Sequence, residues 1–213
     1  MKSLLSIALL CSLSVPAWAN EAQLEKIDVA TDKATIERGA GILMDTCHSC
    51  HSMKYLKYRN LLQFGIDKQK VDGWRGDQPL DAPVLSQMSD SDNMASFGKL
   101  PPDLSLMAKA RDGGPNYLYS YLLAYYTTPD GTLSNHVFPE TKMPDILNIS
   151  SASDETQRKE IRTQAHEVVS FLTWVADPHA TERMHLGYYV LAYLAVLTTL
   201  LYFVKDRIWS RLK

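Results

Sequence analysis

The sequence predicts an all-α fold, made of one domain with long loops and a single transmembrane helix at its C-terminal end. Apolar residues recur at helical spacing in 32–46 and again in 154–176. A stretch without any charged residue, 186–204, follows the second of these segments. With 213 residues, of which 46% are hydrophobic and 22% charged, the chain has the length and balance of one modest globular domain plus appendages.

The N-terminal segment 1–19 has the pattern of a cleaved secretory signal. Lys2 supplies the positive charge, residues 4–13 form a short apolar core, and Ala17-Trp18-Ala19 is a small-x-small cleavage pattern. We therefore expect an exported chain whose mature form begins at Asn20.

The segment Cys47-His48-Ser49-Cys50-His51 is the candidate cofactor-binding motif. Two thiols separated by two residues and followed directly by a histidine form the pattern for covalent attachment of a c-type haem. Each thiol can form a thioether with one vinyl group, and His51 is then close enough to ligate the iron. A thioredoxin-like pair needs a βαβ context, and a zinc site needs a second ligand pair at short spacing, and the sequence offers neither. The motif therefore predicts one covalently bound haem c.

A helix is expected to run into this motif over 32–46. Thr31 or Asp32 can cap its N-terminus, and its apolar residues repeat every three or four positions. Gly39 and Gly41 lie inside it, and each costs about 1 kcal/mol relative to alanine. The two glycines indicate either close packing against another helix or a frayed surface helix, and the sequence leaves both interpretations open.

Two regions follow the motif. Residues 52–62 are expected to form a basic, aromatic helix with a solvated face that also buries tyrosine rings. A short run of this kind in an exported haem protein does not predict a nucleic-acid partner. Residues 65–99 show little periodicity and are expected to be a long loop region.

Helical signals return at 101–111, where two prolines and an aspartate precede an apolar run and Gly113-Gly114 ends it. A second helix is expected from Pro115 or Asn116, with tyrosines along one side. Those rings form either ordinary core or one wall of a haem pocket. Arg111 either complements the C-terminal dipole of its helix or pairs with a haem propionate.

The iron needs a ligand on its second face. Methionine suits a haem that only passes electrons, because Met/His ligation raises the reduction potential. Met143 is favoured, since it lies in an irregular stretch, 139–144, where two prolines restrict the backbone. Met88 and Met94 are the next candidates, and His136 would give a bis-histidine haem.

A long helix is expected over 154–176, capped by Ser153 or Asp154 and ended by Asp177-Pro178. By analogy with cytochrome c folds, this helix packs against the helix at 32–46.

The charge-free segment 186–204 is about 28 Å long as a helix, close to the hydrocarbon thickness of a bilayer. Basic residues follow it at once, and such residues stay in the cytoplasm. We therefore predict a periplasmic haem domain at 20–185, a transmembrane helix at 186–204 and a cytoplasmic basic tail at 205–213. A short cleavable signal indicates a bacterial inner membrane.

Charge divides along the same boundary. The segment 20–185 holds 17 Lys and Arg against 23 Asp and Glu, a net charge of −6, while the whole chain is at −2. A negative domain near a membrane either attracts a basic soluble partner or is simply kept in solution by its charge.

Four stretches make the sequence similar to the cytochrome c1 family, the haem subunits of the ubiquinol-cytochrome c reductase (cytochrome bc1) complex. They are CHSCHSMKYLKYR at 47–59, PPDLSLMAKARDGGPNYLYSYL at 101–122, FPETKMP at 138–144 and VVSFLTWVADP before the C-terminal anchor. The chain departs from the family between 65 and 99, where it is shorter.

The resemblance implies a class I cytochrome c-like haem domain and a role for each matched residue. Cys47 and Cys50 would bear the haem, with His51 and Met143 as axial ligands. Pro101 and Pro102 would pack beside it, and Arg111 and Tyr117 would reach its propionates. The family accepts an electron from the Rieske iron-sulfur protein and passes it to a soluble or membrane-bound cytochrome c, next to cytochrome b, in a dimeric complex of the respiratory chain.

The reaction expected from this resemblance is outer-sphere transfer of one electron. No substrate bond is made or broken, so the chain is not an enzyme by itself and needs no general base or nucleophile. Two other classes stay open: a membrane-tethered electron shuttle without stable partners, and a haem sensor or peroxidase with an exchangeable sixth ligand.

Overall fold

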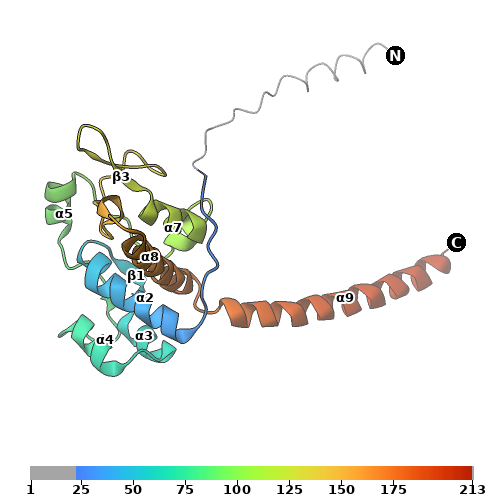
Figure 1. Ribbon diagram of the computed structural model, residues 1–213. Helices are drawn as coiled ribbons and strands as arrows, with labels where there is room; N and C mark the ends of the chain where they lie inside the picture. The colour runs from blue at the N-terminus through green and yellow to red at the C-terminus, as the bar shows by residue number, and fades with distance from the viewer. Residues whose placement is uncertain (1–22, 213) are drawn as a thin grey trace, which may run out of the picture.

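Two long helices, α2 (Lys33–Thr46) and α8 (Glu155–Ala176), pack against each other at the centre of the fold in the computed structural model, which describes residues 23–212 (Figure 1). Asp32 caps α2 by accepting a hydrogen bond from the Thr35 N–H at 2.9 Å, and Asp154 caps α8 in the same way. Both expected helices and their packing are confirmed. The signal predicted for 1–19 lies outside the described residues.

The helices meet at Gly39. A Cβ atom added there would lie 2.0 Å from the Glu167 carbonyl oxygen and 3.0 Å from the Cβ of Phe171, whereas one added at Gly41 would have no heavy atom within 4 Å. Close packing is therefore the correct interpretation of Gly39 and not of Gly41. The Nε of Arg38 adds an ion pair with Glu167 at 2.5 Å across the same crossing.

Shorter elements surround this helix pair, and two small antiparallel sheets, β1-β2 and β3-β4, lie among them. The remaining elements are η2 (Cys47–Ser49), β1 (Met53–Lys57), α3 (Tyr58–Phe64), α4 (Lys68–Arg75), β2 (Pro83–Val84), α5 (Asp90–Phe97), α6 (Met107–Ala110), α7 (Pro115–Leu123), β3 (Tyr125–Thr127), β4 (Leu133–Asn135), η3 (Ile149–Ser151) and α9 (Ala180–Ser210).

The helix expected over 52–62 was wrong in its first half, because β1 occupies that part and α3 begins only at Tyr58. The N–H of Lys54 donates to the Asp103 carboxylate at 2.9 Å, and the N–H of Tyr55 donates to the Ser105 hydroxyl at 3.0 Å. These partners lie about fifty positions away, so periodicity did not reveal them. Tyr58 is buried as expected, but Tyr55 is 76% exposed.

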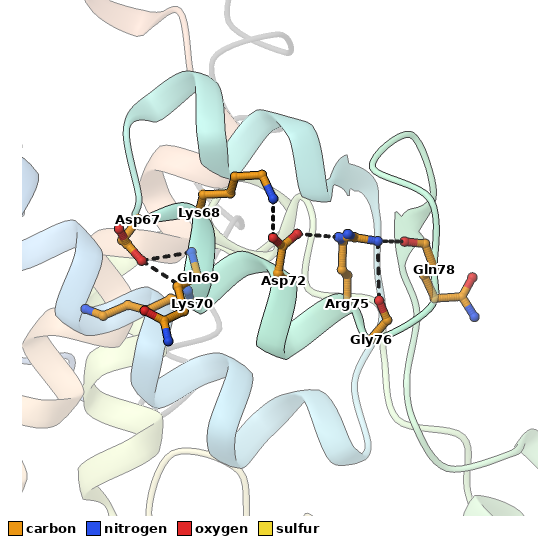
Figure 2. A network of polar contacts seen from close by, with 8 residues as sticks. All are labelled: Asp67, Lys68, Gln69, Lys70, Asp72, Arg75, Gly76 and Gln78. Atoms are coloured by element: carbon orange, nitrogen blue, oxygen red, sulfur yellow. Dashed lines mark hydrogen bonds and ion pairs between the residues drawn. The ribbon is translucent and has the colours of Figure 1, made fainter.

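The region 65–99 is not the long loop that we expected, since it contains α4, β2 and α5. Figure 2 shows the polar contacts within α4 and at its two ends. Asp67 caps the helix by accepting from the Gln69 N–H at 2.8 Å, and Asp72 pairs with the Nε of Arg75 at 2.7 Å. Helix α4 has an Asp67 cap, ion pairs and a single fully buried apolar residue, Val71, while α5 has a Ser89 cap and a buried Asn93. So few buried apolar residues in each short helix leave no repeat for apolar periodicity to detect.

This region also supports the haem-attachment motif. The N–H groups of Gln87 and Met88 donate to the carbonyl oxygens of His48 and Ser49 at 3.2 and 3.0 Å. The segment after β2 therefore covers the motif from outside.

The helix expected over 101–111 is reduced to α6. Pro101 and Pro102 lie outside any helix, and the Asp103 carboxylate accepts from the N–H groups of Lys54 and Ser105. The helix expected from Pro115 is confirmed as α7, with proline at its first position. Gly113 and Gly114 both adopt positive φ between the two helices.

Helix α9 extends away from the rest of the fold (Figure 1). It is 31 residues long, has the apolar composition of a membrane-spanning helix, and has no buried residue. Asp177-Pro178 separates it from α8, as expected.

Candidate functional site

A cavity of about 350 Å³ lies between the Cys47–Ser49 turn, the α6–α7 region, the irregular segment around Met143 and α8. Its walls are mostly apolar, a common property of cofactor sites. All eight residues predicted for the site line it: Cys47, Cys50, His51, Pro101, Pro102, Arg111, Tyr117 and Met143. The fold therefore brings together side chains that are far apart in the sequence.

The two thiols enter the cavity directly after α2. Neither Cys47 nor Cys50 is in a disulfide, and both are half-buried. Burial raises the pKa of the Cys47 thiol to about 11, so this group is a protonated thiol at neutral pH. Among residues 23–212 no group of three His, Cys, Asp or Glu side chains is arranged to hold a metal ion.

The orientation of His51 is set by a backbone carbonyl. Its Nδ1 lies 2.7 Å from the carbonyl oxygen of Pro102, which fixes the proton on Nδ1 and leaves the lone pair of Nε2 free for a metal. Burial lowers the pKa of His51, against smaller opposing effects of Pro102 and Asp103, and so favours the neutral form that can ligate iron.

The other histidine of the motif is placed differently. His48 is only 2% exposed and is not among the residues that line the cavity. Burial also lowers its pKa. The two histidines thus have different environments although three positions separate them.

Met143 is in a segment without helix or strand and lines the cavity. The other candidates named from the sequence, Met88, Met94 and His136, do not line this space. Met94 is 49% exposed in α5, the Met88 N–H donates to the Ser49 carbonyl oxygen, and the His136 ring stacks on Tyr126 with centroids 3.9 Å apart. A second methionine, Met107, does line the cavity, from α6. Two methionines therefore share the cavity with the motif, and Met143 is the one that the sequence favours.

The tyrosine side of α7 forms one wall. Tyr117 and Tyr121 both line the cavity, with ring centroids 6.1 Å apart and planes 10° from parallel. Both rings therefore belong to the wall of this cavity, as the pocket-wall interpretation of the stripe requires. Arg111 lies at the end of α6 and reaches the same cavity, where it is a cation available to a carboxylate.

Sequence reasoning missed a set of polar groups around the Met143 segment. The Tyr121 hydroxyl lies 2.6 Å from the Thr141 hydroxyl, and the fully buried Asn135 donates to the carbonyl oxygen of Tyr121 at 2.9 Å. Isolated hydroxyl and amide groups carry no sequence pattern. Lys99, Lys142 and two residues of α8, Val168 and Leu172, also line the cavity without having been predicted.

The residues present fit a c-type haem. Two free thiols, an imidazole with its Nε2 free and a thioether all border one apolar space, and these are the donors that such a haem needs. Cys47 and Cys50 would attach the haem, and His51 and Met143 would hold its iron.

The chain is similar to known proteins over nearly all of its length. The model of the cytochrome c1 family matches residues 22–83 and 74–212. Cytochrome c1 of Allochromatium vinosum is 30% identical over 210 residues, which cover 84% of this chain and 85% of that relative. The ammonia monooxygenase gamma subunit of Nitrosomonas europaea is 27% identical over 229 residues, which cover 98% and 97% of the two chains. A solved chain of a hyperthermophilic respiratory Complex III has 21% identity and a TM-score of 0.49, covering 99% of this chain and 96% of that one.

Proposed function

The chain belongs to the cytochrome c1 family, and from this premise we propose that it is the haem-bearing electron-transfer subunit of a ubiquinol-cytochrome c reductase. In this role it takes one electron from a Rieske iron-sulfur protein and passes it to a soluble or membrane-bound cytochrome c. The observation that carries the proposal is one cavity lined by Cys47, Cys50, His51 and Met143.

Each of these residues has a task that its surroundings support. When bound, haem c supplies an iron that gains and loses one electron. Cys47 and Cys50 hold the cofactor covalently, and His51 presents Nε2 because Pro102 engages its Nδ1. Met143 would be the second protein ligand of the iron, which would leave no site for an external ligand.

The walls of the cavity would influence the reduction potential of a bound haem and the access of water to it. Tyr117 and Pro101 line the cavity and would exclude water from the ring, and Arg111 and the Tyr117 hydroxyl would be available to its propionates. Because no substrate bond changes, these residues act by binding and shielding rather than by proton transfer.

The C-terminal helix supports a membrane location. Helix α9 is about 46 Å long, more than a bilayer core requires, and basic residues follow its apolar part. We infer that a helix at 186–204 spans a bacterial inner membrane next to cytochrome b. The haem domain at 20–185 then faces the periplasm, and the tail at 205–213 faces the cytoplasm. The net charge of −6 on the outer domain favours a basic electron acceptor.

Copurification tests the assembly. The full chain, expressed with its signal and a haem-maturation system and extracted in mild detergent, should bring a b-type cytochrome and a Rieske protein with it, in a complex containing two copies. A chain that purifies alone would indicate a tethered shuttle. Recovery with subunits of another membrane oxidoreductase, as the Nitrosomonas relative's name allows, would replace the proposal.

The ligand set is tested separately. Axial ligands tune haem reduction potentials over roughly 0.8 V. Met143→Leu should therefore lower the reduction potential of the haem by roughly 0.1 V or more. Met94→Leu, at a methionine outside the cavity, is the control and should leave the potential unchanged. An unchanged potential in Met143→Leu would rule out the assignment. Cys50→Ala should leave one thioether, seen as a shifted pyridine haemochrome band.

A further inference from the structure

The segment that carries Met143 has no regular backbone structure. Residues 136–148 lie between β4 and η3 and belong to no helix or strand. Loops hold side chains less accurately than helices or strands do. Something other than a backbone ladder must therefore fix the thioether.

Side-chain hydroxyl groups bind both polar backbone atoms of Met143. The N–H of Met143 donates to the Thr141 hydroxyl at 3.2 Å. Its carbonyl oxygen accepts from the Tyr125 hydroxyl at 3.1 Å. The peptide groups on either side of the thioether are therefore both held by side chains.

These two contacts are joined into one network through Tyr121. Its hydroxyl lies 2.6 Å from that of Thr141 and 2.9 Å from that of Tyr125. Tyr121 belongs to α7 and Tyr125 to β3, whereas Thr141 belongs to the irregular segment itself. The network thus ties the segment to two regular elements.

One end of the network is protected from water. Tyr125 is 5% exposed, whereas Tyr121 and Thr141 are half-buried and line the cavity. Buried hydroxyl networks of this kind restrict motion because each broken bond leaves a polar group without a partner.

A fourth side chain holds the start of the segment. The Oδ1 of Asn135 accepts from the N–H groups of Val137 and Phe138 at 2.9 and 3.1 Å, and its amide donates to the Tyr121 carbonyl oxygen. The entry to the segment and Met143 are consequently both tied to the same turn of α7.

We propose that Tyr121, Tyr125 and Thr141 are positioning residues that hold the Met143 thioether in the haem cavity and so keep the sixth coordination position closed. The inference rests on the proposed role of Met143 as an axial ligand. A thioether is a neutral and weak ligand, so its retention depends on how well its surroundings place it. Loosening the network should let small external ligands compete for the iron.

The test uses Tyr125→Phe and Thr141→Val in the full haem-loaded chain in detergent. Each removes a hydroxyl with little change in shape. We expect a weaker long-wavelength charge-transfer band of the ferric methionine-ligated haem and a lower reduction potential. Carbon monoxide should bind the ferrous protein roughly fivefold more tightly, the size expected for losing one hydrogen bond.

Two variants serve as controls. Tyr119→Phe makes the same chemical change on α7 at a buried tyrosine that does not line the cavity. It should match the unmodified chain in band, potential and carbon monoxide affinity. Thr141→Ser keeps the hydroxyl group and should restore all three readouts. Covalent haem content and thermal unfolding, measured for each variant, identify those that fold normally.

The outcomes separate this inference from the proposed function. If Met143→Leu abolishes the band while Tyr125→Phe and Thr141→Val behave like Tyr119→Phe, the network has no positioning role and the inference is wrong. If Met143→Leu leaves the band intact, the ligand assignment itself fails. Should Tyr125→Phe fold poorly, Thr141→Val at the partly exposed position decides the question alone.

Discussion

The two ligand-bearing sides of the cavity are built differently. Cys47 and His51 follow α2, whose position is set by its crossing with α8 at Gly39 and by the buried Leu43. Met143 lies in an irregular segment that hydroxyl and amide side chains such as Asn135 tie to its neighbours. Packing therefore places one side and polar side-chain contacts place the other, so different substitutions should disturb each.

The largest expected effect is on the packed side. In Gly39→Ala the new methyl group would meet the backbone of Glu167, which can move only if the helices separate, and we expect a loss of about 3 kcal/mol in the free energy of unfolding. Gly41→Ala meets nothing and should stabilise the same helix by roughly 0.5–1 kcal/mol. Urea unfolding followed by circular dichroism measures the free energy of unfolding of both variants. Equal changes in Gly39→Ala and Gly41→Ala would contradict the assignment of Gly39 as the contact point.

The polar side is probed by Asn135→Ala. This change leaves the N–H groups of Val137 and Phe138 without their partner at a fully buried position, and it removes one of the two donors to the Tyr121 carbonyl oxygen, the other being the Ala124 N–H. We expect a loss of about 2 kcal/mol, together with increased hydrogen exchange confined to the Met143 segment. Asn60→Ala, where the side chain accepts one backbone bond from Lys57, should cost less than about 1 kcal/mol. Exchange that increases instead in α2 would contradict the division between the two sides.

The smallest effect is expected at an ion-pair site between α8 and α9, where the two cations are at least half exposed although the carboxylate is 13% exposed. Asp177, between α8 and α9, accepts from Arg183 Nη1 at 2.7 Å and from Lys109 Nζ at 2.7 Å. These cations, Arg183 first, hold the pKa of its carboxyl group below the ordinary value of 3.8. Asp177→Asn should lower the melting temperature slightly at low salt and not at all at high salt.

The pH dependence of this site follows from the direction of its pKa shift. Because the pKa of Asp177 is lower in the folded chain than in the unfolded one, its contribution to stability is complete above about pH 3.8 and is lost as the pH falls further. The difference in melting temperature between the natural chain and Asp177→Asn should therefore vanish in acid. Glu182→Gln, at an exposed carboxylate whose partner His179 is also exposed, should change the melting temperature less than Asp177→Asn does. A pH-independent difference for Asp177→Asn would refute the ion-pair explanation.

Local signals predicted the regular parts of the molecule well. The caps and apolar spacing of α2 and α8, the proline at the start of α7, and the apolar run of α9 all depend on residues that are neighbours in sequence. The haem-attachment motif is equally local. The irregular parts were predicted poorly. Strand β1 depends on distant partners, Asp103 and Ser105, and α4 and α5 are short helices with side-chain caps and little apolar periodicity.

The sequence by itself determined that α2 leads into Cys47, Cys50 and His51, and it favoured Met143 over the other methionines as the second ligand. Only the tertiary structure decided that all four border one cavity, that Gly39 rather than Gly41 is the point of helix contact, and that Tyr121, Tyr125 and Thr141 hold the Met143 segment. The physical reason is the range of the interactions. Capping and periodicity act within a few residues, whereas hydrogen bonds and backbone contacts between distant segments exist only once the chain has folded.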